Sequence, residues 1–262
     1  MSTEVQQDPW EPLRRHTPAR IGIGRAGTSL PTRELLDFNA AHAQARDAVL
    51  TPLDVAALGA DLSGAGWAWL SVQSRAAGRD IYLRRPDLGR RLDEASLEHL
   101  RSLPPEPSPE SEPAPAPLDL VIVLGDGLSA VATQRHALPL LSPLKQALGG
   151  HMRIGPLLIA TQARVALGDE IGAVLGARAV LVLLGERPGL SSPDSLGAYL
   201  TFGPALGRSD AERNCVSNIR PAGLVPELAA QRLAWLLREA LRRGLSGVGL
   251  KDDSERELLG GP

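Results

Sequence analysis

The chain has 262 residues and a formal net charge of -2, from 28 basic and 30 acidic residues. This balance argues against nucleic acid as a partner, because nucleic-acid binders usually carry a basic excess on one face. It also gives no reason to expect a polybasic contact with a membrane. Hydrophobic residues make up 43% of the chain and aromatic residues only 3%, so we expect an aliphatic core.

The sequence contains a single cysteine, Cys215, which cannot form an internal disulfide and is typical of a reducing compartment. No apolar run approaches the ~18 residues that span a membrane, so we expect no membrane segment. Residues 1–20 are polar and interrupted by proline. They show neither the apolar stretch of a signal peptide nor the periodicity of a targeting helix. We therefore predict a cytoplasmic protein.

Residues 1–103 are predicted to form a small, mainly helical N-terminal region. Apolar residues recur at helical spacing in three segments, and Thr32 is a candidate cap for the first of them. The expected elements are helices at residues 33–49, 53–62 and 93–103 and a candidate short strand at residues 80–83.

Four arginines fall within residues 84–91. Such a run is typical of a solvated surface. Guanidinium groups also bind carboxylates in a bidentate manner, so a contact with an acidic partner surface is the alternative.

Residues 104–117 contain seven prolines mixed with Glu, Ser and Ala. Proline removes backbone donors and restricts φ, so this stretch is predicted to be an extended, semi-rigid linker. It divides the chain into the N-terminal region and a larger C-terminal domain at residues 118–262.

The C-terminal domain alternates between apolar, strand-like runs and helical segments. The strands are apolar on both faces, which indicates a sheet covered on both sides. We predict an α/β fold with a Rossmann-like, doubly wound, mostly parallel sheet, preceded by the small helical domain. The expected strands are residues 120–124, 155–160, 179–184 and 196–202, and the expected helices begin near residue 129 and cover residues 169–175 and 226–243.

Ligands of such sheets bind beyond the carboxyl ends of the strands. This rule selects residues 125–129, 161–168 and 185–190 as site loops, together with the loop expected after the fourth strand, where Cys215 lies. Glu186 follows the third strand directly. Its carboxylate could accept hydrogen bonds from a polar ligand or form an ion pair with Arg187.

Residues 125–130 (GDGLSA) match the dinucleotide fingerprint G-x-G-x-x-A between a strand and a helix. A dinucleotide-binding oxidoreductase is therefore an alternative function. The fingerprint also requires an acidic residue after the next strand, and residues 160–163 (ATQA) provide none. A tight turn, with Ser129 or Asp126 as helix cap, explains the glycines more simply.

The sequence shows no phosphate-binding loop, no zinc-ligand spacing and no G-x-S-x-G stretch. Its five histidines form no metal-ligand cluster, so we expect no metal site. Cys215 has Arg213 nearby, but the nearest histidine in sequence is His151. Nucleophilic catalysis is therefore poorly supported.

Five runs carry a resemblance to a known family, and they are residues 19–27, 82–92, 125–129, 185–190 and 214–219. In their order and spacing these runs are similar to the small subunit of ethanolamine ammonia-lyase, and the resemblance spans most of the chain. The Pro-rich segment departs from the family pattern and looks like an insertion that does not touch the site loops.

The resemblance implies a hetero-oligomeric carbon–nitrogen lyase that converts ethanolamine to acetaldehyde and ammonia by a radical mechanism with adenosylcobalamin. A large, barrel-shaped partner subunit is implied to bind ethanolamine and to carry most of the chemistry, so the isolated chain is expected to be inactive. The resemblance also places cobalamin, with its own base on cobalt, at the subunit interface. The D-x-H-x-x-G pattern of proteins that displace this base is absent here. The resemblance also adds a bacterial microcompartment to the cytoplasm as an expected location of this protein.

The family's cofactor contacts fall on Val165, Glu186 and Cys215 when they are carried over to this sequence. Val165 is expected to meet the corrin rim, Glu186 to accept hydrogen bonds from corrin amides, and Cys215 to make a small, soft contact. No catalytic residue and no metal ligand is assigned to this chain. A scaffold that has lost its cofactor is a third alternative.

Overall fold

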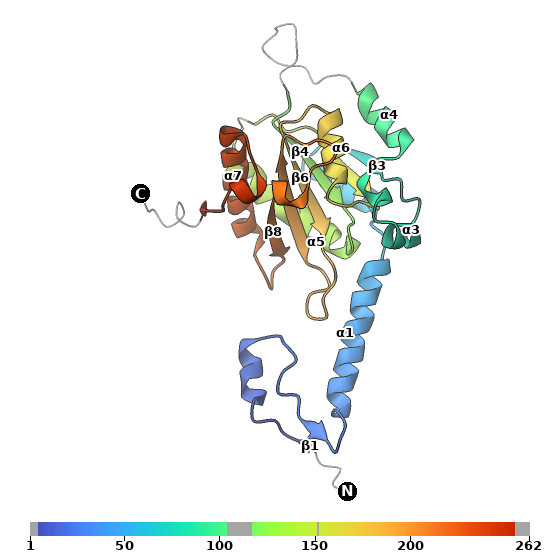
Figure 1. Cartoon of the computed structure of the whole chain (residues 1–262), viewed down its shortest axis with the longest axis vertical. Coiled ribbons are helices and arrows are strands. Elements are labelled where there is room, and N and C mark those ends of the chain that lie inside the picture. Colours follow the sequence, from blue (N-terminus) through green and yellow to red (C-terminus); the bar gives the residue numbers. More distant parts are fainter. Residues whose placement is uncertain (1–4, 104–116, 151, 255–262) are drawn as a thin grey trace.

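The computed structural model describes residues 5–103, 117–150 and 152–254, which form a six-stranded sheet with helices on both faces (Figure 1). The strands run in the order β3-β5-β4-β6-β7-β8. They are β3 (Trp69–Gln73), β4 (Leu120–Gly125), β5 (Leu157–Thr161), β6 (Ala179–Gly185), β7 (Leu196–Phe202) and β8 (Arg213–Ile219).

Strands β3, β5, β4 and β6 are parallel, whereas β7 and β8 extend the sheet in antiparallel fashion. The α/β class is therefore confirmed, with a mixed sheet, and the Rossmann-like assignment stays a prediction. After β4 the chain passes to β5 on one side and then to β6 on the other. A topological switch point consequently lies between β4 and β6.

The sequence pattern does not predict two of these strands. Strand β3 precedes the Pro-rich segment, yet it pairs with β5, so residues before that segment belong to the main sheet. Strand β8 occupies the segment predicted to be a site loop, and that prediction is wrong. In β8 only Arg213, Val216 and Ile219 are buried, and this edge strand lacks the continuous apolar run that marks a central strand.

Six predicted helices are confirmed, and a seventh, α3, replaces a predicted strand. The helices are α1 (Thr32–Leu50), α2 (Val55–Gly64), α3 (Arg79–Arg84), α4 (Glu94–Ser102), α5 (Ala130–Leu148), α6 (Leu167–Val174) and α7 (Pro226–Arg243). Short 3₁₀ turns are η1 (Glu11–His16), η2 (Leu88–Arg90), η3 (Asp210–Glu212) and η4 (Gly247–Gly249).

Residues 80–83 are helical, with i to i−4 backbone hydrogen bonds from Tyr82 to Gly78 and from Arg85 to Ile81. Tyr82 is buried and Leu83 is exposed. Asp80 and Arg84 form an i,i+4 ion pair at 2.6 Å on the outer side. At α1, the predicted cap Thr32 is instead the first helical residue and makes no capping hydrogen bond.

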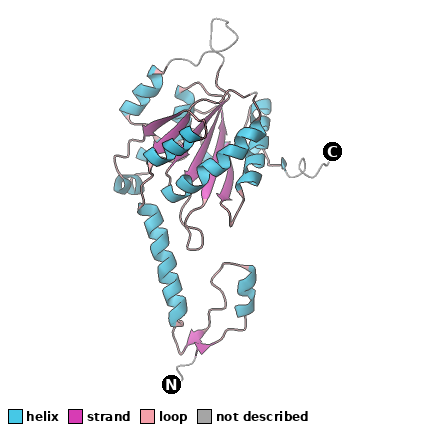
Figure 2. Ribbon diagram, turned by 180° about the vertical axis from the view of Figure 1, so that it is seen from behind, coloured by secondary structure: helices cyan, strands magenta, loops and turns pink. Residues whose placement is uncertain are grey.

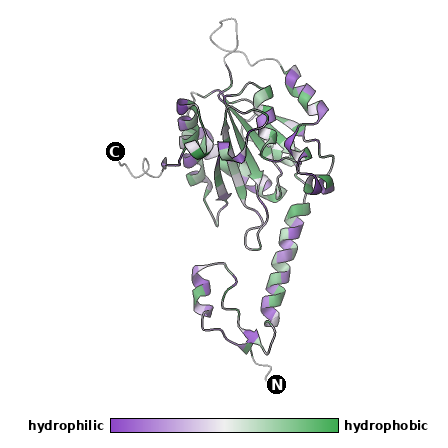
Figure 3. Cartoon of the chain, in the orientation of Figure 1, coloured by the Kyte–Doolittle hydropathy of each residue, from purple (hydrophilic) through white to green (hydrophobic). Residues whose placement is uncertain are grey.

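Helices lie on both faces of the sheet (Figure 2), and its strands are largely hydrophobic (Figure 3). The core consists of two aliphatic layers, one on each face. On one face the helices α2, α5 and α7 cover side chains such as Ile122, Leu181 and Leu200. On the other face α4 and α6 cover side chains such as Val123 and Val182. The predicted aliphatic core is confirmed.

Residues 5–50 form an N-terminal arm that projects away from the sheet (Figure 1). It contains η1, the small hairpin β1 (Val5–Gln6) and β2 (Arg25–Ala26), and α1. The predicted linker lies outside the described residues except for Pro117, and the division into two domains stays a prediction. Among the described helices, none is both long and apolar enough to cross a membrane.

Candidate functional site

The carboxyl ends of β4, β5 and β6 meet at one edge of the sheet, as their parallel pairing requires. Strand β7 runs antiparallel to β6 and begins at the same edge, where Leu196 pairs with Gly185. Ligands of open α/β sheets bind at such a switch point. Three of the loops predicted from the sequence surround it.

Asp126, directly after β4, fixes the loop that follows β5. Its carboxylate oxygens accept the backbone N–H groups of Gln162 and Ala163 at 2.8 and 2.9 Å. These bonds hold Gln162 at a positive φ of 54°, which is uncommon for a residue with a side chain. Burial raises the pKa of Asp126, and the backbone hydrogen bonds oppose that shift. Asp126 therefore shapes the loop that carries Val165 and does not cap α5.

The glycines after β4 allow two backbone segments to approach closely. A Cβ on Gly127 (φ 56°) would lie 2.1 Å from the carbonyl oxygen of Gly185. The same carbonyl accepts the Leu128 N–H at 2.8 Å. The turn thus packs against the end of β6 instead of facing an open groove, which disfavours the dinucleotide alternative. Ser129 occupies the N-cap position of α5 as predicted, but its side chain makes no capping hydrogen bond, because its hydroxyl donates to the carbonyl of Pro193.

Glu186 follows β6, and residues at the start of β7 hold its carboxylate. Ser195 Oγ donates to Glu186 Oε2 at 2.5 Å, and the Glu186 N–H donates to the Ser195 carbonyl at 2.9 Å. Gly197 provides the space for this carboxylate. A Cβ there would lie 2.6 Å from Glu186 Oε1 and 3.0 Å from Cε2 of Tyr199. The acceptor group is therefore oriented before any ligand arrives.

Cys215 lies in β8 opposite Tyr199 of β7, and not in a loop as predicted. The residue is exposed, yet desolvation of its thiol raises the thiol pKa, and the negative charge of Glu186 raises it further. Desolvation likewise raises the pKa of Tyr199. The thiol is therefore protonated at neutral pH, which suits a soft contact and not a nucleophile.

Val165, Glu186 and Tyr199 line one open cleft of about 450 Å³, which we call the rim cleft. The other lining residues are Tyr82, Leu128, Arg164, Leu184, Gly185 and Arg187. Two of the three predicted cofactor contacts thus share a cleft. Cys215 lies next to its Tyr199 wall without being among the lining residues.

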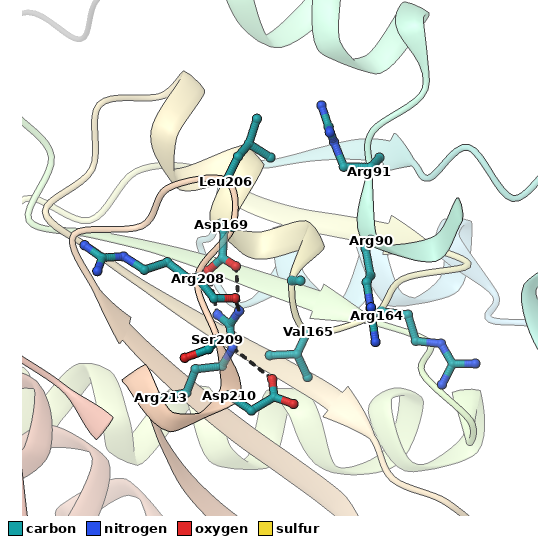
Figure 4. A pocket seen from close by; sticks show the side chains of 12 residues that line it. Arg90, Arg91, Arg164, Val165, Asp169, Leu206, Arg208, Ser209, Asp210 and Arg213 are labelled. Carbon is teal, nitrogen blue, oxygen red and sulfur yellow. Dashed lines mark hydrogen bonds and ion pairs between the residues drawn. The ribbon is translucent and has the colours of Figure 1, made fainter. Parts of the chain in front are cut away.

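A second cleft, of about 570 Å³, shares Arg164 and Val165 with the rim cleft (Figure 4). We call it the arginine cleft because five arginines line it, and they are Arg90, Arg91, Arg164, Arg208 and Arg213. Its acidic lining residues are Asp169 and Asp210. Arg213 is buried and binds Asp169 through two hydrogen bonds of 2.6 and 2.7 Å.

Tyr82 lines the rim cleft and contacts the loop after β5. Its ring lies between two guanidinium groups, with Arg79 at 4.8 Å and Arg164 at 4.3 Å from the ring centroid. Its hydroxyl donates to the carbonyl of Ala163 at 3.0 Å. The Arg164 N–H donates to the carbonyl of Gly89 at 2.8 Å. The arginine run of the sequence therefore packs against the site instead of forming only a solvated surface.

Sequence reasoning misses Ser195, Gly197 and Tyr199, although a signal for two of them exists. In the sequence of β7, Gly197 and Tyr199 alternate with the apolar residues Leu196, Ala198 and Leu200. A period of two places glycine and tyrosine together on one face of the sheet. Their link to Glu186 depends on the antiparallel pairing of β7, which this pattern does not reveal.

No group of three or more His, Cys, Asp or Glu side chains in the described ranges could hold a metal ion. None of the histidines in those ranges lines either cleft. The two clefts instead combine apolar walls, the carboxylates of Glu186, Asp169 and Asp210, and several guanidinium groups. Such a surface suits a large ligand with scattered polar groups.

The fold and the clefts define the class of this protein. It is an α/β protein with two clefts at the carboxyl ends of its parallel strands. A family model described as "Ethanolamine ammonia-lyase light chain (EutC)" matches residues 7–251. The chain therefore belongs to the family of ethanolamine ammonia-lyase small subunits.

Curated relatives support this assignment over nearly the whole chain. The ethanolamine ammonia-lyase small subunit of Pseudomonas paraeruginosa (strain DSM 24068 / PA7) is 54% identical over 256 residues, covering 97% of this chain and 91% of the relative. The protein of the same name from Bradyrhizobium diazoefficiens is 54% identical over 95% of this chain and 93% of its own length. That from Rhodopseudomonas palustris (strain BisA53) is 55% identical, over 94% and 90%.

Proposed function

We propose that this chain holds adenosylcobalamin, with its own base on cobalt, at the interface with a large, barrel-shaped subunit. The complex converts ethanolamine to acetaldehyde and ammonia, and the large subunit binds ethanolamine. Membership of the small-subunit family supports the reaction and the partner. The observation that carries the cofactor assignment is the rim cleft, where the fixed carboxylate of Glu186 meets the apolar wall formed by Val165.

The residues of the rim cleft fit the chemistry of a corrin. The corrin rim is apolar and bears many neutral amide groups, which need acceptors and donors more than one strong charge. Glu186 supplies an acceptor held by Ser195, and Val165 supplies an apolar wall that packs against the core. Cys215 supplies a protonated, polarisable contact beside Tyr199. The absence of a side chain at Gly197 leaves the space that the Glu186 carboxylate occupies.

This chain contributes binding and orientation instead of proton transfer. Adenosylcobalamin supplies a carbon radical when its cobalt–carbon bond breaks homolytically. None of the histidines in the described residues lines the clefts, so none stands ready to replace the cofactor's base. We therefore expect the isolated chain to have no lyase activity, and turnover without the large subunit would contradict this division of labour.

Co-expression with the large subunit tests the proposal. The purified complex should retain cobalamin through gel filtration, as seen in its absorption spectrum, and should bind no NAD. Binding of NAD by the isolated chain would instead favour the dinucleotide alternative. A complex that assembles but never takes up cobalamin would favour a scaffold without cofactor.

Replacing Glu186 by Ala tests the assignment at single-residue level. The Glu186→Ala complex loses an ionised acceptor for corrin amides, so its cobalamin affinity should fall by about tenfold or more. Glu98→Ala is the matched control, because Glu98 is an exposed glutamate on α4 that lines neither cleft. Equal affinities of the two variants would remove Glu186 from the site.

A further inference from the structure

The arginine cleft holds more positive charge than the carboxylates around it neutralise. Arg213 is paired with Asp169 and, at 3.4 Å, with Asp210, Arg91 with Glu170 at 3.0 Å, and Arg208 with Glu212. Within the described part of the chain, neither Arg90 nor Arg164 lies within ion-pair distance of a carboxylate. Two uncompensated guanidinium groups therefore face one cleft.

Arg164 is held in place with an unused donor. Its Nη2 donates to the carbonyl of Tyr82 at 3.3 Å, and its guanidinium lies on the Tyr82 ring. Its Nε is buried and has no hydrogen-bond partner. This N–H is unsatisfied beneath the surface of the cleft, so contact with a ligand falls to the terminal nitrogens of the guanidinium. A stacked, preoriented guanidinium is well suited to bind an oxyanion.

Arg90 is coupled to Arg164 through Gly89. The Gly89 carbonyl accepts the Arg164 N–H at 2.8 Å, and a Cβ on Gly89 would lie 2.9 Å from Cγ of Arg164. The turn η2, which ends at Arg90, thus lies directly against the loop after β5. Figure 4 shows both side chains on the same side of the cleft, beyond Val165.

We propose that Arg90 and Arg164 form an anion subsite that takes the phosphodiester of cobalamin's nucleotide loop. This inference rests on the proposed function. The corrin amides are neutral, and the phosphodiester is the anionic group of cobalamin. The subsite adjoins the rim cleft through Arg164 and Val165, which line both clefts. Ethanolamine is a cation at neutral pH, and two guanidinium groups would repel it.

The faces of the cofactor agree with this placement. The adenosyl group must face the subunit that holds ethanolamine, because its radical abstracts a substrate hydrogen. The opposite face, which carries the base, the ribose and the phosphodiester, would then be turned toward this chain. A phosphodiester that reaches the arginine cleft would meet the two guanidinium groups that line it, from Arg90 and Arg164.

Cobinamide, a corrin without the nucleotide loop, separates this role from a general effect on the site. The two-subunit complex is titrated with cyanocobalamin and with dicyanocobinamide, followed by absorption spectroscopy. Arg90→Gln with Arg164→Gln should weaken cyanocobalamin binding by about tenfold to hundredfold and cobinamide binding much less, since only Arg164 of the two also lines the rim cleft. Added salt should reduce the affinity of the unaltered complex more than that of the variant.

Arg84→Gln is the matched control, because Arg84 belongs to the same arginine run but lines neither cleft and pairs with Asp80. It should bind both corrins as the unaltered complex does. Arg90→Gln alone provides a second test, because Arg90 is exposed and its loss leaves the stack on Tyr82 intact.

Three results would overturn the subsite. Equal losses for both corrins would show that the arginines act through the fold. Unchanged corrin affinity with weaker subunit association in sedimentation would show that they bind an acidic surface of the large subunit. Unchanged affinity and association would leave them without a role. Failure of the proposed function looks different, because the unaltered complex would then bind neither corrin.

Discussion

Glu186, Tyr199 and Cys215 come from three successive strands and form one polar group at the edge of an aliphatic sheet. Ser195 holds the carboxylate through a short hydrogen bond, and desolvation, with a further contribution from the Glu186 charge, raises the pKa of the Cys215 thiol. Each side chain thus sets the state of its neighbour. A ligand meets a preoriented surface and need not reorganise it, which lowers the cost of binding.

Gly197 is the residue whose substitution should disturb this group with the least effect on the fold. In Gly197→Ala the new Cβ would lie 2.6 Å from Glu186 Oε1, the movable end of a flexible side chain. The carboxylate should shift while the strand persists, so cobalamin affinity should fall by about tenfold with little change in Tm. Absorption titration of the complex and thermal unfolding measure the two effects.

Gly64→Ala is the control for this substitution, because a Cβ on Gly64 would meet nothing within 4 Å. It should leave cofactor affinity unchanged. If Gly197→Ala retained the full affinity, the position of the Glu186 carboxylate would not matter for the cofactor.

At residue scale, the sequence predicts those contacts that follow directly from a strand end. Glu186 comes after β6 and Val165 after β5, and the three-strand pattern together with the family resemblance selects both. Cys215 is assigned by resemblance alone, and its place in β8 is not predicted. Arg164 and Tyr82 escape detection because a cation–aromatic stack between residues 82 positions apart in sequence leaves no local pattern.

Among the elements, α6 and β8 are joined by a buried ion pair. Asp169 in the first turn of α6 binds Arg213 at the start of β8, and both side chains are almost fully buried, at 2% and 3% exposure. Arg213 also donates to Thr201 Oγ1 at 2.9 Å. Arg213 lies two residues before Cys215, and Asp169 lies four residues after Val165. The ion pair therefore helps to set the distance between Val165 and Cys215, two of the proposed cofactor contacts.

Breaking this pair from one side should be costly. Asp169→Leu leaves the Arg213 charge buried without its bidentate partner, and the free energy of unfolding should fall by about 3–5 kcal/mol. The double variant Asp169→Leu with Arg213→Met removes both charges and should lose less than the sum of the two single variants. Urea unfolding of the full chain, followed by circular dichroism, measures all three. Additive losses would show that the two charges do not interact.

Element prediction succeeds where a pattern is uniform and fails where an edge is polar. Central strands such as β4 and β6 are apolar on both faces and are found directly from sequence. Strand β8 (RNCVSNI) is an edge strand that buries only Arg213, Val216 and Ile219, and its polar residues are typical of a loop. In residues 80–83, Tyr82 is buried and Leu83 is exposed, a pattern that fits a strand or a helix. The hydrogen bond from the Tyr82 N–H to the Gly78 carbonyl is helical and is not visible in the sequence.

In the whole molecule, the N-terminal arm contrasts with the compact sheet. Its helix α1 carries Leu35, Leu36 and Phe38 with exposures of 47%, 61% and 41%. None of these residues belongs to either aliphatic core layer. Helical periodicity in the sequence therefore predicts α1 correctly but does not reveal that its apolar face lies outside the core of this chain.

Exposed leucines on a projecting helix should promote self-association of the isolated chain. Leu35→Gln with Leu36→Gln should shift sedimentation profiles toward the monomer, because it removes apolar surface from an exposed face of α1. The free energy of unfolding of the sheet should stay within about 0.5 kcal/mol, since neither side chain packs in the core. Ala43→Gln, an exposed change on the same helix, is the control and should alter neither property. Unchanged self-association of the double variant would mean that this face of α1 is not what brings chains together.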